Sequence, residues 1–379
     1  MLKQLLLSIN KQSAPPPALN GKLFTCGANS QYTTGQGTTV GQTQTMTQVG
    51  SVITWVKIES AYFSTVGLRD DGTLWSVGSN ANGPTGQGTG TGTTNALTQI
   101  GADTDWRDFS ATDAAALAIK TNGTLWAWGN NSNFQTGLNT ATGFATIPTQ
   151  VGTDTDWSQA ATGTVMGAGI KTDGTLWTWG LNASGNTGQG TTSGNITVPT
   201  QVGSDTDWAF VSCSYDGMHV IKTNGTLWAC GYGPSIGFGS AATIYSTPTQ
   251  VGSDTDWLMT SSGYEAFLAL KTNGTLYSCG KNSAGTTGQG TSVGATDFLT
   301  QIGTDTNWVS CQISGGGFAS LQGVARKSNG QLWGWGFNTT FQLGLGNNTN
   351  QLSPVQIGSA TDWIQASTGP SHSSGIRDF

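Results

Sequence analysis

Residues able to do acid–base chemistry near neutral pH are scarce in this chain of 379 residues. The two histidines are His219 and His372, and neither stands in a Ser-Asp or Cys arrangement that would activate a nucleophile. Glycine-rich strings such as residues 86–92 fall between expected strands rather than at the start of a helix, so they do not predict a phosphate cradle. We therefore expect no catalytic residue, no cofactor and no enzymatic activity.

Paired carboxylates are the second set of residues with chemical potential, because Asp-x-Asp supplies the oxygen ligands that Ca²⁺ prefers. The acids recur at one position along the chain: Asp103, Asp105, Asp154, Asp156, Asp205, Asp207, Asp254, Asp256, Asp305 and Asp362. Basic residues recur at another position: Arg69, Lys120, Lys171, Lys222, Lys271, Lys327 and Arg377. A calcium site needs about six oxygens or more, and here a base is expected beside the acids. We predict ion pairs and turn hydrogen bonds, and no metal site.

Both charged positions belong to a unit that recurs about every 50 residues, most clearly Lys-Thr-Asn-Gly-Thr-Leu-Trp-Ala-Trp-Gly at residues 120–129. The glycine of this unit occurs seven times, at Gly21, Gly72, Gly123, Gly174, Gly225, Gly274 and Gly330. Only strand and turn signals fill the period. Such a repeat predicts the blades of a β-propeller.

One repeat contains the signals for four short antiparallel strands. Strand A covers residues 125–128 and is apolar on both faces, so it needs cover on both sides. A loop over residues 130–147 leads to strand B at residues 148–151, strand C opens at Trp157, and strand D ends at Lys171. We expect Asn122-Gly123 to form a two-residue hairpin turn with two positive φ angles. The turns that join B to C and D to A should share one face, with the acids and the bases on it.

The tryptophans and the chain ends predict how the blades assemble. All fifteen tryptophans are in register, eight in strand A and seven at the head of strand C, which indicates packing between blades. Residues 363–379 supply strands C and D, whereas the first strand A begins at Asn20. The predicted fold is therefore all-β, a seven-bladed β-propeller of four-stranded antiparallel blades, closed by a blade shared between the N- and C-termini. One domain should cover residues 20–379.

Composition limits the possible partners. Charged residues make up 9% of the chain, against roughly 25% in a typical soluble domain. The net charge is −6 and Lys and Arg form no cluster, so we expect no nucleic-acid partner. Three of the five cysteines, Cys26, Cys230 and Cys279, share one repeat position, and a ring would keep equivalent positions whole blades apart, so we expect free thiols.

The first 19 residues lie outside the repeat. They contain a short apolar run and three prolines at residues 15–17, which form a stiff spacer. The run is too short for a secretion signal or for membrane insertion. One interpretation is a disordered start; the other is an arm, residues 1–19, that docks on a partner protein through Leu5, Leu6, Leu7 and Ile9.

The motifs of the repeat also resemble those of a known family. Asp/Asn-Gly-x-Leu-Trp-x-Trp-Gly is followed by Gly-Gln-Gly (residues 188–190 and 288–290) or Gly-Leu-Gly (residues 344–346), and later by Pro-x-Gln-Val. Over residues 20–379 this combination resembles the repeat of the regulator-of-chromosome-condensation family. The resemblance implies a seven-bladed β-propeller. Family repeats often carry Gly-x-x-His near strand D, and only residues 369–372 fit that register here, so the resemblance does not transfer functional residues.

Aromatic residues outside the repeated positions are the candidates for recognition. They are Tyr32, Phe134, Phe144, Tyr245, Phe298 and Phe341, all expected in the loops between strands A and B. The alternative is that these rings fold onto the blade below them.

We expect a non-catalytic display scaffold that binds protein partners through this neutral loop face. Low charge and free thiols favour a phage or virus particle component, such as a structural, decoration or receptor-binding protein located in the virion, with virion proteins or a host receptor as partners. The alternative is an extracellular or bacterial cytoplasmic regulator or inhibitor that binds a GTPase or an enzyme cleft. A third class is an enzyme with a site in the central channel that uses His219 and His372.

Overall fold

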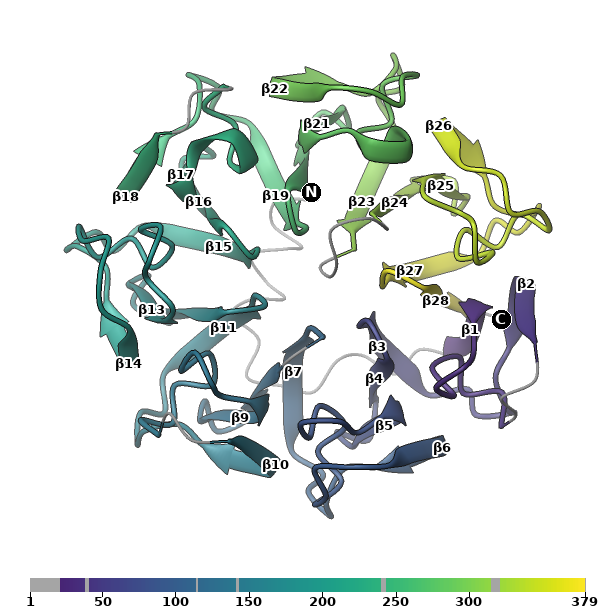
Figure 1. The fold of residues 1–379 in the computed structure, drawn as a ribbon, viewed down its shortest axis with the longest axis horizontal. Coiled ribbons are helices and arrows are strands. Elements are labelled where there is room, and N and C mark those ends of the chain that lie inside the picture. The colour runs from purple at the N-terminus through teal and green to yellow at the C-terminus, as the bar shows by residue number, and fades with distance from the viewer. Residues whose placement is uncertain are drawn as a thin grey trace.

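Seven four-stranded antiparallel sheets stand in a ring around a central channel (Figure 1). The computed structural model describes residues 21–37, 41–113, 115–140, 143–239, 243–314 and 321–378. The predicted fold class and the predicted number of blades are confirmed. The expected docking arm, with Leu5, Leu6, Leu7 and Ile9, lies outside the described residues.

Every blade has the strand order C-D-A-B from the channel outward. The C strands are β3 (Trp55–Ser60), β7 (Trp106–Ala111), β11 (Trp157–Thr162), β15 (Trp208–Cys213), β19 (Trp257–Ser262), β23 (Trp308–Ile313) and β27 (Trp363–Thr368). The D strands are β4 (Ser64–Arg69), β8 (Ala115–Lys120), β12 (Met166–Lys171), β16 (Gly217–Lys222), β20 (Ala266–Lys271), β24 (Gln322–Lys327) and β28 (His372–Asp378). The A strands are β5 (Leu74–Ser79), β9 (Leu125–Asn130), β13 (Leu176–Gly180), β17 (Leu227–Tyr232), β21 (Leu276–Lys281), β25 (Leu332–Gly336) and β1 (Gly21–Ala28). The outermost B strands are β6 (Thr93–Gln99), β10 (Phe144–Gln150), β14 (Ile196–Gln201), β18 (Ile244–Gln250), β22 (Ala295–Gln301), β26 (Gln351–Gln356) and β2 (Gln42–Gln48). Two 3-10 turns, η1 (Gly233–Ser235) and η2 (Ser283–Gly285), lie in loops between strands A and B.

The ring closes through a blade made from both ends of the chain. Strands β27 and β28 from the C-terminal end pair with β1 and β2 from the N-terminal end, and β1 pairs with β28 from Gly21 opposite Asp378 to Gly27 opposite His372. We number the blades from the one that begins with β3, so the shared blade is blade 7. The predicted closure is confirmed.

Tryptophan side chains pack between neighbouring blades. Trp157, at the head of β11 in blade 3, is 1% exposed and shares an apolar cluster with Leu117 and Ile119 of blade 2. Its ring meets Trp177 and Trp179 edge to face, with ring centroids 6.1 Å apart in both pairs. The equivalent tryptophans are each no more than 5% exposed: Trp55, Trp106, Trp208, Trp257, Trp308 and Trp363. Packing between blades, as predicted, therefore accounts for them.

The hairpin between strands D and A differs from the predicted two-residue turn. Gly123 N donates to Lys120 O over 2.9 Å, and Lys120 N donates to Thr124 O over 3.1 Å. Gly123 has a φ of 79°, whereas Asn122 is not at positive φ. The loop is therefore a three-residue turn with a glycine bulge. The reason is local, because Asn122 Oδ1 accepts hydrogen bonds from both Thr124 N and Thr124 Oγ1.

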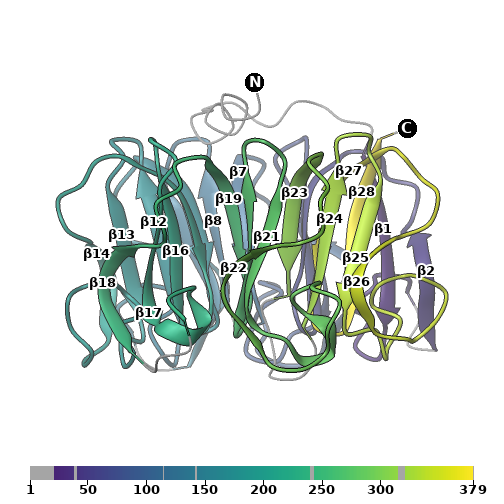
Figure 2. The same ribbon diagram turned by 90° about the horizontal axis from the view of Figure 1, so that it is seen from above.

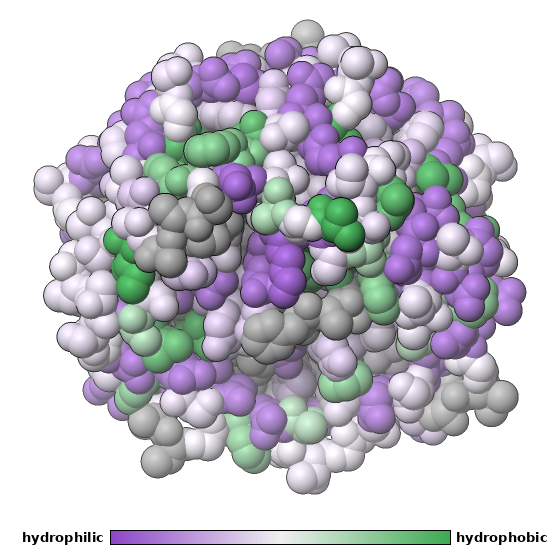
Figure 3. Space-filling view, turned by 45° about the horizontal axis from the view of Figure 1, so that its top comes forward, coloured by the Kyte–Doolittle hydropathy of each residue, from purple (hydrophilic) through white to green (hydrophobic). Residues whose placement is uncertain are grey.

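The surface is polar, with scattered apolar residues. Figure 3 shows small green patches of hydrophobic residues separated by white and purple residues. Several exposed apolar side chains lie on or beside outer strands, including Ile147 at 56% and Phe298 at 65%. All five cysteines are buried and free, as predicted. Among the described residues, no helix is long and apolar enough to span a bilayer.

Replacing Trp157 with alanine tests the packing between blades. Trp157→Ala removes a fully buried indole from the boundary of blades 2 and 3, so it should lower the free energy of unfolding by about 3–5 kcal/mol. Urea unfolding followed by circular dichroism measures the change. Val293→Ala, at a site that is 81% exposed, should change stability by no more than about 0.5 kcal/mol. Equal effects of the two substitutions would contradict the assigned role of the tryptophans.

Candidate functional site

One face of the ring carries the turns that join B to C and D to A. We call it the turn face; the C-terminus marks it at the top of Figure 2. On it, Lys171 Nζ lies 5.2 Å and 4.4 Å from the ring centroids of Trp157 and Trp177, and 2.8 Å from Asp154 and 3.2 Å from Asp156. Burial opposes the charge, but the hydrogen bonds and charges of both aspartates outweigh it and raise the pKa of Lys171.

The same cage recurs around the turn face. Three further lysines lie between two aromatic rings and two aspartates: Lys120, Lys222 and Lys271. The predicted ion pairs are therefore present, with acids and bases on one face as expected. The described residues contain no group of three or more His, Cys, Asp or Glu side chains that could hold a metal ion. The repeated carboxylates of the turn face are thus paired with basic residues of the same blade.

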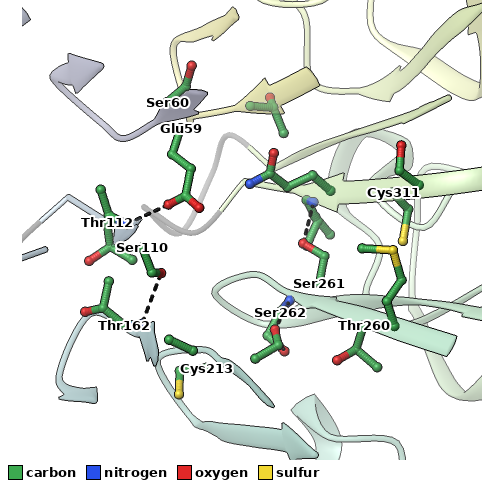
Figure 4. Close-up of a pocket in the computed structure, with 18 of the residues that line it drawn as sticks. Glu59, Ser60, Ser110, Thr112, Thr162, Cys213, Thr260, Ser261, Ser262 and Cys311 are labelled. Atoms are coloured by element: carbon green, nitrogen blue, oxygen red, sulfur yellow. Dashed lines mark hydrogen bonds between the residues drawn. The ribbon is translucent and has the colours of Figure 1, made fainter. Parts of the chain in front are cut away.

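The central channel is lined by the innermost strands and contains a cavity of about 310 Å³. Side chains on its wall form hydrogen bonds between neighbouring blades at several boundaries (Figure 4). Ala111 N donates to Glu59 Oε2 over 2.6 Å, Thr162 N to Ser110 Oγ over 3.2 Å, and Ile313 N to Ser261 Oγ over 3.0 Å. Polar residues that face the channel therefore also stabilise the ring through hydrogen bonds between neighbouring blades.

Charged residues gather on the cavity wall formed by blades 1 and 2. Lys57 Nζ lies 3.2 Å from Glu59 and 2.8 Å from Asp108. Burial opposes the charge of Lys57, but the two carboxylates outweigh it and raise its pKa. Burial also raises the pKa of Glu59 despite the nearby lysine. Asp113, which accepts a hydrogen bond from Tyr62 N, has its pKa raised by burial to about 7. Sequence reasoning missed this cluster; the available signal was that these charges fall outside the repeated charged positions.

The two histidines lie in the seams between blades and do not line the cavity. His219 Nδ1 lies 2.8 Å from Ser262 Oγ, and His372 Nε2 lies 2.8 Å from Thr65 Oγ1. Burial lowers the pKa of each histidine to about 3, so both are neutral at pH 7. Both histidines therefore pack between blades. Neither side chain faces the channel, where the third alternative, an enzyme that uses His219 and His372, would need it.

The six aromatic candidates do not form one site. Tyr32, Phe134 and Phe341 lie in loops between strands A and B, half-buried, at φ angles of 61°, 61° and 62°. The other three lie on outermost strands and not in loops, because strand B begins earlier than predicted: Phe144 on β10, Tyr245 on β18 and Phe298 on β22. The six residues belong to five different blades.

Aromatic residues missed by the sequence analysis lie in the loops between strands C and D. Phe63 is 45% exposed and meets Tyr62 with ring centroids 4.0 Å apart. Tyr215 of blade 4 stacks on Tyr264 of blade 5 at 4.5 Å. These loops join the strands that line the channel to their neighbours. The only sequence signal was that these loops differ in residue type from blade to blade.

Acid should destabilise the fold through the histidines. An unfolded histidine titrates near pH 6.5 and these two near pH 3, so between those values the unfolded chain binds more protons and stability falls as the pH falls. The loss approaches about 1.4 kcal/mol per pH unit for each histidine. The double variant His219→Asn/His372→Asn should therefore lose less stability than the wild type between pH 6.5 and pH 4, measured by urea unfolding. Parallel pH profiles would contradict these pKa values.

Comparisons with known proteins agree with this geometry. Two family models, both described as the regulator of chromosome condensation (RCC1) repeat, match the chain. One matches residues 173–221 and 329–376, and the other matches residues 106–135 and 260–286. The ultraviolet-B receptor UVR8 of Arabidopsis thaliana is 26% identical over 273 residues, which cover 70% of this chain and 49% of the receptor. The match thus spans about half the length of that curated relative.

Solved structures show the same architecture at low identity. Yeast RCC1 (Prp20), solved bound to Kap60, has a TM-score of 0.82 and 17% identity, over 98% of this chain and 92% of its own. Human WBSCR16 has a TM-score of 0.81 and 16% identity, over 94% of this chain and 99% of its own. At such identities the likeness shows the fold alone. The chain is thus a seven-bladed β-propeller that contains regulator of chromosome condensation repeats at the matched segments.

Proposed function

We propose that this propeller is a non-catalytic scaffold that binds a protein partner on the face opposite the turn face. This opposite face carries the A–B and C–D loops. We call it the loop face. One observation carries the proposal: the turn face repeats the same lysine cage in four of the seven blades, whereas the C–D loops change from blade to blade. Variable loops on a rigid scaffold are the usual place for recognition.

The chemistry of the C–D loops suits a protein interface. Phe63 is exposed beside Tyr62, and the stacked pair Tyr215 and Tyr264 lies in loops that also carry acids. Aromatic side chains are enriched at the centres of protein interfaces and supply much of the binding energy there. A similar propeller, yeast Prp20, is described with protein partners. One structure shows it bound to Kap60, and another comes from a study of its binding to Gsp1p and histones.

Within this function we favour a virus particle component over a regulator. The support is compositional, since only 9% of residues are charged and the five cysteines are free. Co-purification with head or tail proteins from assembled particles tests this idea. Tight binding of the monomer to a GTPase or a hydrolase, with no particle association, would favour the regulator instead.

Two matched substitutions test which surface binds. Phe63→Ser removes an exposed ring from a C–D loop, and Phe298→Ser removes one from outer strand β22. Phe63→Ser should weaken binding of a co-purified partner by roughly tenfold or more, as expected for an interface anchor, while Phe298→Ser leaves it unchanged. Surface plasmon resonance measures both affinities. Weaker binding by Phe298→Ser, with unchanged binding by Phe63→Ser, would instead indicate an interface on the outer strands.

A further inference from the structure

An arginine replaces an aliphatic residue at one place in strand D. Arg326 on β24 pairs with Ser310 on β23. The residues at the same place in the other blades are Leu68, Ile119, Ile170, Ile221, Leu270 and Ile376, each no more than 3% exposed. Since side chains alternate along a strand, Arg326 points the same way as Val324, which packs against Trp363 of blade 7. A cation therefore occupies a seam where six blades bury hydrocarbon.

The guanidinium of Arg326 has no partner among the described residues. Its Nε is buried without a hydrogen bond. Burial lowers the pKa of Arg326, and no described carboxylate offsets that effect. Arg326 is half-buried, and a partly desolvated charge without a partner is unfavourable. Because Arg326 lines the central cavity, a ligand there can supply the missing negative charge.

Two further polar side chains beside Arg326 are also unpaired. Ser310 and Gln312 line the cavity from β23, and neither side chain has a hydrogen bond to any described residue. Gln312 on β23 is equivalent to Ser261 on β19, and Ser261 Oγ accepts a hydrogen bond from Ile313 N of the next blade. Ala366 of blade 7 is partly exposed, whereas the equivalent residue of blade 1, Ile58, is larger and fully buried. The smaller side chain leaves the seam open toward the channel.

We propose that the seam between blades 6 and 7 binds a small-molecule oxyanion, a carboxylate or a phosphate, through Arg326. Ser310 and Gln312 act as further donors to the same group. A planar guanidinium can give an oxyanion two parallel N–H bonds, which a lysine cannot. The central cavity of about 310 Å³, which all seven blades line, gives a small oxyanion room to reach this seam. This site is separate from the loop-face interface and does not depend on it.

Titration of the full chain with inorganic phosphate and with malonate, at constant ionic strength set by NaCl, tests the site. Isothermal calorimetry should show saturable binding of at least one of the two anions to the wild type. Their relative affinity tells a phosphate ligand from a carboxylate ligand. Arg326→Leu should weaken that binding by about tenfold or more, because it removes the charged donor, and Gln312→Leu should weaken it less.

Folding and charge controls make the result decisive. Arg326→Leu restores the aliphatic residue of the other six blades, so its melting temperature without anion should equal or exceed that of the wild type. Lys281→Met removes one positive charge at an exposed ion pair with Glu265 and should leave anion binding unchanged. The absence of saturable binding, equal binding by Arg326→Leu, or a loss of stability in that variant would each overturn the proposal.

Discussion

Packing of indole rings between neighbouring sheets is the interaction on which the rest of this structure depends. Each blade has an apolar surface on both sides, so no blade can hide its hydrocarbon from water without two neighbours. A linear stack would leave two sheets uncovered at its ends. The ring removes both ends, and the pairing of β1 with β28 completes blade 7 from both ends of the chain, so every blade has two neighbours.

Hydrogen bonds at the outer edge reinforce the same boundaries. Gly190 N in the A–B loop of blade 3 donates to Ser246 O on outer strand β18 of blade 4, and Gly290 N of blade 5 makes the equivalent contact with Leu352 O of blade 6. Gln189 Nε2, between the glycines of the Gly-Gln-Gly motif, donates to Thr178 Oγ1 and Thr200 O. The motif therefore has an architectural function, since it fixes the loop and covers part of an otherwise open strand edge.

Much of the fold could be predicted from the sequence because seven similar blades require the same strand and turn residues seven times along the chain. Trp157 and its equivalents mark where each C strand begins, which of its faces is buried, and that this face packs against a neighbouring blade. Local geometry was harder to predict: the side chain of Asn122 bonds its own turn, so only Gly123 adopts positive φ. The charged cavity wall could not be predicted, because Lys57 and Asp108 are 51 residues apart and meet only when adjacent innermost strands face one channel.

Departures from the repeat carry more functional information here than the repeat itself. Seven copies of one unit act as an internal reference, so a position that differs in one blade is not required by the shared architecture. The lysine cages of the turn face follow the reference and have their partners in place. Arg326 breaks it at a site where leucine or isoleucine would pack, and so does the cluster around Glu59. Partly burying an arginine in place of a hydrocarbon lowers stability unless a partner offsets the desolvation. Both of these departures line the central cavity, so a ligand or partner that enters the channel would meet residues that the repeat does not require.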